Sequence, residues 1–215
     1  MRPALIISIT LIILFLALGI VLAPTLPDNI PSHWNLKGEV DGYMSKDIGL
    51  LFLPLLAMMI MGLMVVLPRY DPDYRRYTEF QSAYDGLILL IVSFLMILYG
   101  ITLLWSSGIE ISMNTLMSVM FALLYIGVGI FLRSVKKVWF VGIRTPWTLL
   151  SEDVWIKTHQ AGSWIFILAG IFCLGGIFAT QYAYFFVLVP MSIGVCGIIV
   201  YSYLLYQKEV RSDEK

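Results

Sequence analysis

The chain has 215 residues, of which 60% are hydrophobic and 13% are charged, and its mean hydropathy is +0.87. A typical soluble domain has about 25% charged residues, so this composition excludes an ordinary soluble protein. Fourteen basic and fourteen acidic residues cancel, which leaves no overall charge to attract nucleic acid directly.

Six apolar runs follow one another along the chain, each near the ~20 residues needed to cross a bilayer. They cover residues 4–23, 48–67, 86–105, 113–132, 163–180 and 183–206. None of them contains Asp, Glu, Lys, Arg or His, whereas proton relays and ion-coupled carriers place ionisable groups at membrane depth. The predicted fold is an all-α integral membrane protein with six transmembrane helices, a multi-pass protein of the cell membrane.

Basic residues are divided unequally between the polar segments. Twelve of the fourteen lie at the termini and in the loops 68–85 and 133–162, while Lys37 and Lys46 lie in the loop 24–47. Because cytoplasmic loops carry the excess of Lys and Arg, both termini are expected to be cytoplasmic. The loop 24–47 then faces outward, and the loop 133–162 faces the cytoplasm.

The chain divides into two halves of three spans, residues 1–107 and 108–215, each with a long polar loop after its first span. Three spans per half would invert the second half, as in some transporters, although no residue-level repeat accompanies this division. Gly175 and Ala179 are four residues apart, which favours a close approach of two helices there.

The outer polar loop, residues 26–46, reads LPDNIPSHWNLKGEVDGYMSK. His33, Trp34 and Asn35 form a compact group with an aromatic face and several hydrogen-bonding atoms, and Gly38 allows a tight turn. One interpretation is a recognition surface for something outside the cell. The alternative is a tight extracellular cap with Trp34 at the membrane interface.

The inner polar segment, residues 142–159, reads GIRTPWTLLSEDVWIKTH. Ser151 is placed to cap a helix that runs from Glu152 towards Gly162, on which Trp155 and His159 share one face. The predicted geometry is a bend at Pro146 followed by an amphipathic helix in the headgroup layer. Tryptophans recur as in an interfacial aromatic belt, at Trp139, Trp147, Trp155 and Trp164.

Arg144 has a planar guanidinium that suits a phosphate or a carboxylate. It is a candidate docking residue for a cytoplasmic partner. The alternatives are an ion pair with Glu152 or Asp153, or contact with a lipid headgroup.

No pattern typical of an enzyme is present. The two histidines, His33 and His159, are predicted on opposite faces of the membrane, so they cannot share a metal ion. No nucleophile motif, zinc-protease motif or glycine-rich phosphate loop occurs. The sequence therefore predicts no catalytic site, no metal and no cofactor.

Both polar segments resemble those of the SdpI family, membrane proteins named after an immunity protein against a secreted killing factor. The outer LPDNIPSHWNLKGEVDGY is similar to the family's N-terminal domain signature, and the inner GIRTPWTLLSEDVWIKTH is similar to its C-terminal signature. One position departs from the family pattern, because Val138 stands where an asparagine is expected four residues before Gly142.

The resemblance implies a non-enzymatic protein that gives immunity to a secreted peptide toxin and reports it by holding a cytoplasmic transcriptional repressor at the membrane. The matched positions are His33, Trp34, Asn35, Gly38, Arg144, Thr145, Pro146, Trp147, Trp155 and His159. The expected partners are membrane lipids, the toxin outside and the repressor inside. A small-solute or lipid transporter and a membrane scaffold without ligand are the alternatives.

Overall fold

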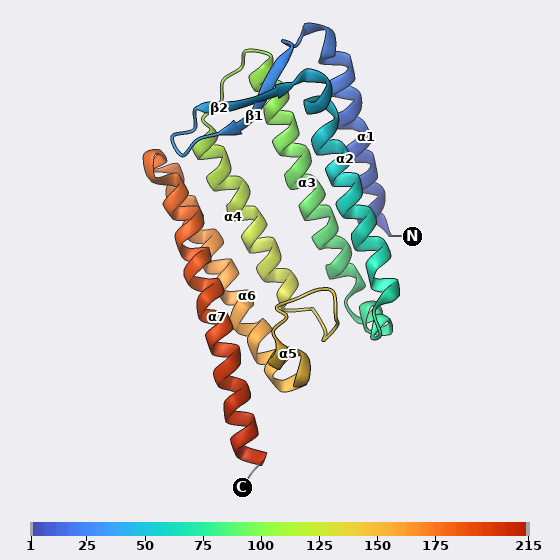
Figure 1. Ribbon diagram of the computed structural model, residues 1–215, viewed down its shortest axis with the longest axis vertical. Helices are drawn as coiled ribbons and strands as arrows, with labels where there is room; N and C mark the ends of the chain where they lie inside the picture. Colours follow the sequence, from blue (N-terminus) through green and yellow to red (C-terminus); the bar gives the residue numbers. More distant parts are fainter. Residues whose placement is uncertain (1, 214–215) are drawn as a thin grey trace.

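The computed structural model describes residues 2–213, and six of their helices are long and apolar enough to cross a membrane. They run up and down as one bundle (Figure 1). They are α1 (Pro3–Leu22), α2 (Lys46–Val66), α3 (Gln81–Ser106), α4 (Met113–Leu132), α6 (Glu152–Cys173) and α7 (Ala183–Asp213). The predicted all-α membrane fold with six spanning helices is confirmed.

Shorter elements connect these helices. Strands β1 (Asn29–Trp34) and β2 (Val40–Ser45) form an antiparallel hairpin between α1 and α2. The short helix α5 (Pro146–Leu150) precedes α6. Single 3-10 turns are η1 (Ala23–Thr25), η2 (Leu67–Tyr70), η3 (Tyr74–Glu79), η4 (Leu174–Ile177) and η5 (Thr180–Tyr182).

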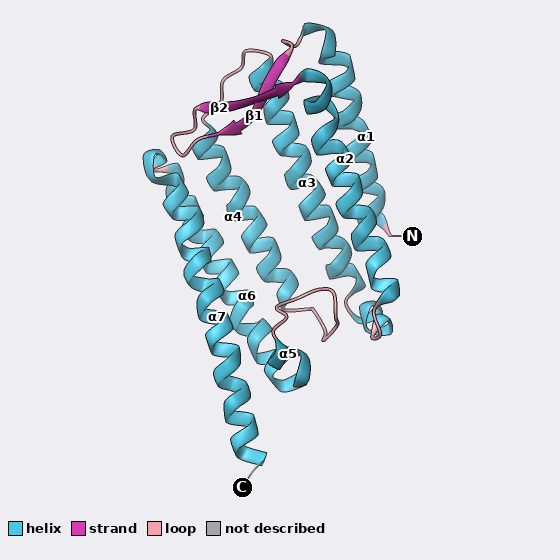
Figure 2. Ribbon diagram, in the orientation of Figure 1, coloured by secondary structure: helices cyan, strands magenta, loops and turns pink. Residues whose placement is uncertain are grey.

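The hairpin lies across one end of the bundle (Figure 2). We call this the hairpin end, and the opposite end, towards which both chain termini point, the terminal end. The terminal end also holds η2, η3, the loop 133–145 and α5 (Figure 1). The hairpin was not among the predicted elements.

The helices pack as two groups of three, α1 with α2 and α3, and α4 with α6 and α7, which meet along α3 and α4. Buried residues of α3 recur every three or four positions, at Tyr84, Ile88, Val92, Met96 and Tyr99. Such spacing places them on one helix face. These five residues belong to the main core cluster, so α3 is the central helix of the bundle.

Glycines let α4 and α6 approach backbone to backbone. A Cβ at Gly129 of α4 would lie 2.8 Å from the Ser163 carbonyl oxygen, and one at Gly170 of α6 would lie 2.8 Å from the Ala122 carbonyl oxygen. The two contacts are reciprocal, because each helix supplies one glycine to the backbone of the other. Interfaces between membrane helices are enriched in small residues for this reason.

The close helix contact predicted at Gly175 and Ala179 does not form in that way. The α-helix ends at Cys173, and Gly175 lies in η4, where it contacts the aromatic ring of Phe186 rather than a helix backbone. The prediction for Gly175 and Ala179 is therefore wrong, because both residues lie beyond the end of α6.

Two helices begin five or more residues before the apolar runs that predicted them. Because α3 begins at Gln81 and α6 at Glu152, these helices include Asp85 and His159. The absence of ionisable residues therefore holds for the apolar runs but not for the helices. Asp85 is buried and accepts hydrogen bonds from the guanidinium of Arg2, with its Oδ2 2.9 Å from Arg2 Nε.

Candidate functional site

The prediction of an amphipathic helix in the headgroup layer is wrong, because residues 152–162 form the first three turns of the continuous helix α6. Their apolar face is covered by protein rather than lipid, and the exposed fraction of Trp155 is 1%. The aromatic belt is correspondingly smaller than predicted. Trp139 and Trp164 are exposed, whereas Trp155 is buried and Trp147 is half-buried.

His159 joins the loop before α5 to α6. The N–H of Ile143 donates to His159 Nε2 at 2.9 Å, so Nε2 carries no proton, and Nδ1 donates to the Trp155 carbonyl at 2.8 Å. The imidazole is therefore a neutral ring with both nitrogens satisfied. It stacks on Trp155 with 4.0 Å between ring centroids, which confirms that these two residues share one helix face.

Gly142 is the residue that lets the loop reach His159. Its φ is +114, a conformation that side chains rarely adopt, and a Cβ there would lie 2.6 Å from His159 Nε2 and 2.9 Å from the Trp155 ring. Glycine has no Cβ to clash and adopts positive φ readily. Gly142, the first residue of the inner segment, is thus required for the contact with His159, its last residue.

Residues 145–151 contain the N-terminal caps of two consecutive helices, α5 and α6. The Thr145 hydroxyl accepts from the N–H of Thr148, and the Thr148 hydroxyl accepts from the N–H of Thr145, which makes a reciprocal cap for α5. Pro146 opens α5 at a position where its missing N–H is not needed. Ser151 accepts from the N–H of Val154, so the predicted cap of the next helix is confirmed.

The inner segment also forms hydrogen bonds with α7. The indole nitrogen of Trp147 donates to Ser202 Oγ at 2.5 Å, and its ring contacts Tyr203 edge-on. The hydroxyl of Ser151 donates to Glu209 Oε1 at 2.9 Å. Both partners are on α7, so the inner segment connects α6 to the terminal half of that helix.

Arg144 is exposed, and its Nη1 donates to the backbone carbonyl of Trp139 at 2.5 Å. The ion pairs considered for it are not formed, because Glu152 pairs with Arg76 and Asp153 pairs with Lys157. The guanidinium thus turns one edge to the loop and is otherwise accessible at the terminal end.

Asp71 is a site residue that the sequence interpretation missed. It is 4% exposed, and its carboxylate accepts from the Tyr77 hydroxyl, the backbone N–H of Asp73 and the backbone N–H of Trp139. Burial and the bond to Asp71 raise the pKa of Tyr77 well above its ordinary value, which keeps the phenol protonated as a donor. The Asp-Pro-Asp turn at residues 71–73 was the available signal.

The Asp71 carboxylate links the two helix groups at the terminal end. Asp71 follows η2 between α2 and α3 of the first group, and Trp139 follows α4 of the second group. Two ion pairs lie beside it. Arg76 Nη1 is 2.9 Å from Glu152 Oε1, and Lys136 Nζ is 3.9 Å from Glu79 Oε2. The loop 67–80 and the inner segment therefore form one polar layer.

At the hairpin end, Asn35 builds the turn between β1 and β2. Its side-chain oxygen accepts from the N–H groups of Lys37 and Glu39, and its amide donates to the Glu39 carboxylate at 3.0 Å. Gly38 completes the turn with φ +82, and a Cβ there would lie 3.0 Å from Asn114 Oδ1 of α4. Asn35 and Gly38 thus shape the hairpin and seat it on α4.

His33 and Trp34 differ in their surroundings. His33 is exposed, with Nδ1 2.5 Å from Asp41 Oδ1 on the facing strand. The Trp34 ring meets the Trp105 ring edge-on, with 6.3 Å between centroids. Its indole Nε1 is shielded from solvent and finds no acceptor among residues 2–213. A buried donor without an acceptor is costly, so it is a notable feature of this end.

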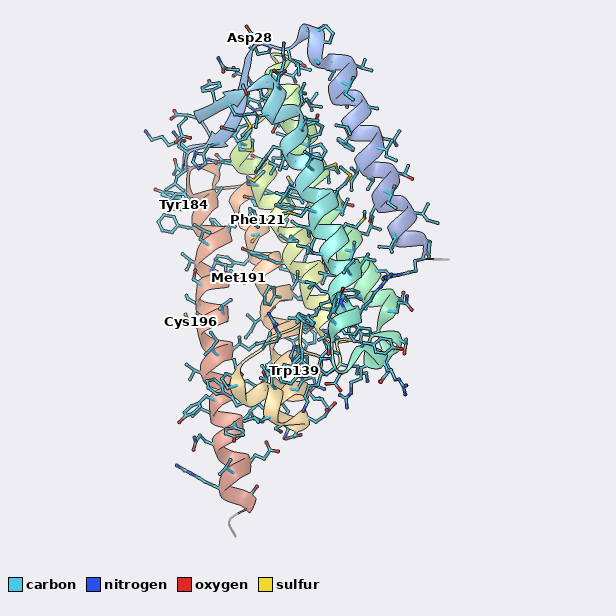
Figure 3. All side chains as sticks on the ribbon, turned by 45° about the vertical axis from the view of Figure 1, so that its right-hand side comes forward. Asp28, Phe121, Trp139, Tyr184, Met191 and Cys196 are labelled. Carbon is cyan, nitrogen blue, oxygen red and sulfur yellow. The ribbon has the colours of Figure 1, made fainter. Side chains whose placement is uncertain are left out.

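Beneath the hairpin lies a cavity of about 330 Å³, with a mainly apolar wall, between α3, α4 and α7. Its rim includes His33, Trp34 and Asn35. Deeper apolar residues include Phe121 and Tyr184, which Figure 3 shows towards the hairpin end of the bundle. Ligand sites are commonly concave and apolar with a few polar groups, as this one is.

The structure thus separates the predicted site residues into two places. His33, Trp34, Asn35 and Gly38 gather at the hairpin end, and the six residues of the inner segment gather at the terminal end, where Figure 3 labels Trp139. The two histidines lie at opposite ends, as predicted. Within residues 2–213, no three His, Cys, Asp or Glu side chains lie close enough to hold a metal ion.

The fold defines a multi-pass helical membrane protein with one polar site at each end of the bundle. Residues 134–204 match the SdpI/YfhL protein family, and residues 10–58 match a domain of unknown function, DUF1648. The C-terminal part of the chain is thus similar to the SdpI/YfhL family. It is 26% identical over 211 residues to "Immunity protein SdpI" of Bacillus subtilis (strain 168), which covers 94% of this chain and 96% of that protein. No solved structure matches the chain significantly.

Val138, where the family resemblance leads one to expect asparagine, is fully buried in the main core cluster. An apolar side chain suits this environment, since a buried amide would need hydrogen-bond partners there.

Proposed function

We propose that the protein is a non-enzymatic membrane immunity protein that protects its cell against a secreted peptide toxin. The observation that carries this proposal is the similarity over nearly the whole of both chains to a protein named for immunity. Both polar sites described above lie within the aligned families, the hairpin within residues 10–58 and the inner segment within residues 134–204.

In this proposal the hairpin end faces outward. Its loops contain five carboxylates and two lysines, whereas eleven basic residues of the described range 2–213 lie in the segments at the terminal end. An excess of Lys and Arg marks the cytoplasmic side of a membrane protein. A toxin arriving from outside would then meet the hairpin and the cavity beneath it first.

The cavity is the proposed recognition site. Its apolar wall suits an apolar side chain of the toxin. Burial of that side chain against the apolar wall would favour binding.

α7 provides the connection to the cytoplasmic side. Its residues Val187 and Leu188 line the cavity, and Ser202 on the same helix binds Trp147 of the inner segment. The two places are about 22 Å apart along the helix at 1.5 Å per residue. We infer that an occupied cavity alters the inner segment through α7 and that this segment holds a cytoplasmic repressor.

The test uses cells that express the chain and are challenged with a candidate secreted peptide toxin. Trp34→Ala should lower the tolerated toxin concentration by about 30-fold, the effect of losing a buried tryptophan anchor. Trp34→Phe keeps an aromatic side chain but replaces the indole by a smaller ring without the N–H, so its loss should be smaller, about 2- to 10-fold. Trp139→Ala, which removes an exposed tryptophan at the terminal end, is the control.

Protein levels in the membrane are measured for each variant. Full protection by Trp34→Ala at a normal protein level would remove the hairpin and its cavity from the mechanism. Equal loss in the Trp139→Ala control would show a general defect rather than recognition.

A further inference from the structure

A second cavity, of about 180 Å³, lies at the terminal end where α4 meets α6. Unlike the cavity beneath the hairpin, it is lined largely by charged and polar side chains. The residues that matter here are Arg133, Lys136, Glu152 and Gln160, with the stacked Trp155 and His159 at its wall.

Arg133 is held in a fixed position at this cavity. Its Nε donates to Ser163 Oγ at 2.9 Å, and its guanidinium carbon lies 4.4 Å from the centroid of the Trp164 ring. No carboxylate of residues 2–213 forms an ion pair with it. The guanidinium is therefore oriented in advance by a hydrogen bond and a cation–π contact, and its two terminal nitrogens remain to bind an anion.

The charges around the cavity leave one positive charge uncompensated. Glu152 is neutralised by Arg76, with Nη1 2.9 Å and 3.0 Å from the two carboxylate oxygens. Lys136 is only loosely paired, at 3.9 Å from Glu79. With these two pairs balanced, Arg133 carries the remaining charge. A phosphodiester, which has one negative charge, is the matching ligand.

The position of the cavity indicates where such a ligand comes from. Arg133 directly follows α4, whose 20 residues span about 30 Å, the thickness of the bilayer core. Trp164 beside it is 58% exposed, as expected of a tryptophan at the membrane interface. The cavity therefore opens at the level of the lipid headgroups.

We propose that this cavity binds the phosphate of an anionic phospholipid, with Arg133 as the main ligand-binding residue and Lys136 as the second. The headgroup then packs against the wall formed by the Trp155 and His159 rings. Lipid binding would in this way stabilise the inner segment from the side opposite to Gly142.

The experiment uses the full chain in detergent and counts bound lipid by native mass spectrometry after addition of phosphatidylglycerol or phosphatidylcholine. The wild type should retain phosphatidylglycerol in preference to phosphatidylcholine. Arg133→Gln should weaken that retention by about five-fold, the effect of removing one base near an anionic headgroup, and Lys136→Gln should weaken it less. Arg75→Gln removes the same charge from an exposed residue outside the cavity and should retain the lipid.

Lys136→Gln also keeps the test decisive if Arg133→Gln does not fold, because the side chain of Lys136 is 49% exposed. Equal retention by Arg75→Gln and by both cavity variants would overturn the proposal. A thermal stabilisation by inorganic phosphate that equals the one by phosphatidylglycerol would assign the cavity to free phosphate and overturn the lipid assignment.

Discussion

Replacing Gly142 by alanine tests whether the inner segment depends on the contact between its two ends. At φ +114 a side chain brings strain of about 1–3 kcal/mol. The new Cβ would lie 2.6 Å from His159 Nε2, so the ring must move and the Ile143 N–H loses its acceptor. An unsatisfied buried donor costs about 1–3 kcal/mol. We expect Gly142→Ala to lower the free energy of unfolding by roughly 2–5 kcal/mol.

Two other glycines separate these contributions. Gly108 has φ +85 with no atom within 4 Å of an added Cβ, so Gly108→Ala measures backbone strain alone. Gly62 lies within α2 with equally open space, and Gly62→Ala should have little effect. The assay is thermal unfolding in one detergent, followed by tryptophan fluorescence. Gly142→Ala should lower Tm by on the order of 10 °C and Gly108→Ala by a few degrees.

The prediction also requires coupling between Gly142 and His159. In a His159→Ala background, the added Cβ no longer meets His159 Nε2 and the Ile143 N–H has already lost its acceptor, although the Trp155 ring still lies 2.9 Å away, so Gly142→Ala should cost less than it does in the wild type. If Gly142→Ala were no less stable than Gly108→Ala, or if its cost did not change in that background, the contact would contribute nothing and the reasoning would be refuted.

Three further predictions concern other parts of the molecule. In a cysteine-free background, a cysteine at the exposed position Ser45 should be labelled from outside the cell, and one at the exposed position Ser134 from inside. Labelling of both from one side would contradict the orientation with the hairpin end outside. Asp71→Asn replaces one of the two accepting oxygens by an NH2 donor, so at least one of the three bound donors loses its acceptor, at a cost of about 1–3 kcal/mol in thermal unfolding. Asp28→Asn, whose side chain is 99% exposed, should cost almost nothing. Arg144→Lys should weaken membrane recruitment of the candidate repressor although the charge is kept, because lysine cannot form the two parallel hydrogen bonds of a guanidinium. Equal recruitment by wild type, Arg144→Lys and Arg144→Ala would exclude Arg144 from docking.

The helices were predictable because their signal is local. Runs of about 20 apolar residues are sufficient to identify spans, and the cap at Ser151 and the shared face of Trp155 and His159 follow from spacing alone. What covers that face was not predictable, because the N–H of Ile143 comes from a loop whose path depends on Gly142. A helix in the headgroup layer was the natural alternative for an amphipathic pattern.

The hairpin and the role of Asp71 were missed for different reasons. Strand β1 contains Pro31 and strand β2 contains Asp41 and Gly42, residues that are depleted in strands, so neither run had a clear strand pattern. The main partner of Asp71 is a backbone N–H 68 residues away along the chain. Contacts to backbone groups at such distance leave no trace in residue types.

Because α7 is long, a small bend within it displaces its C-terminal end by a large distance. Its 31 residues measure about 46 Å, and Figure 1 shows its C-terminal part extending beyond the other helices. Pro190, just below the cavity, lacks a backbone N–H and is the softest point of this helix. From there to Asp213 the helix extends about 34 Å, so a bend of about 10° at Pro190 would swing its far end by about 6 Å. A fluorophore fixed near that end would report small displacements in the cavity as large changes in distance, with no need to label the cavity itself.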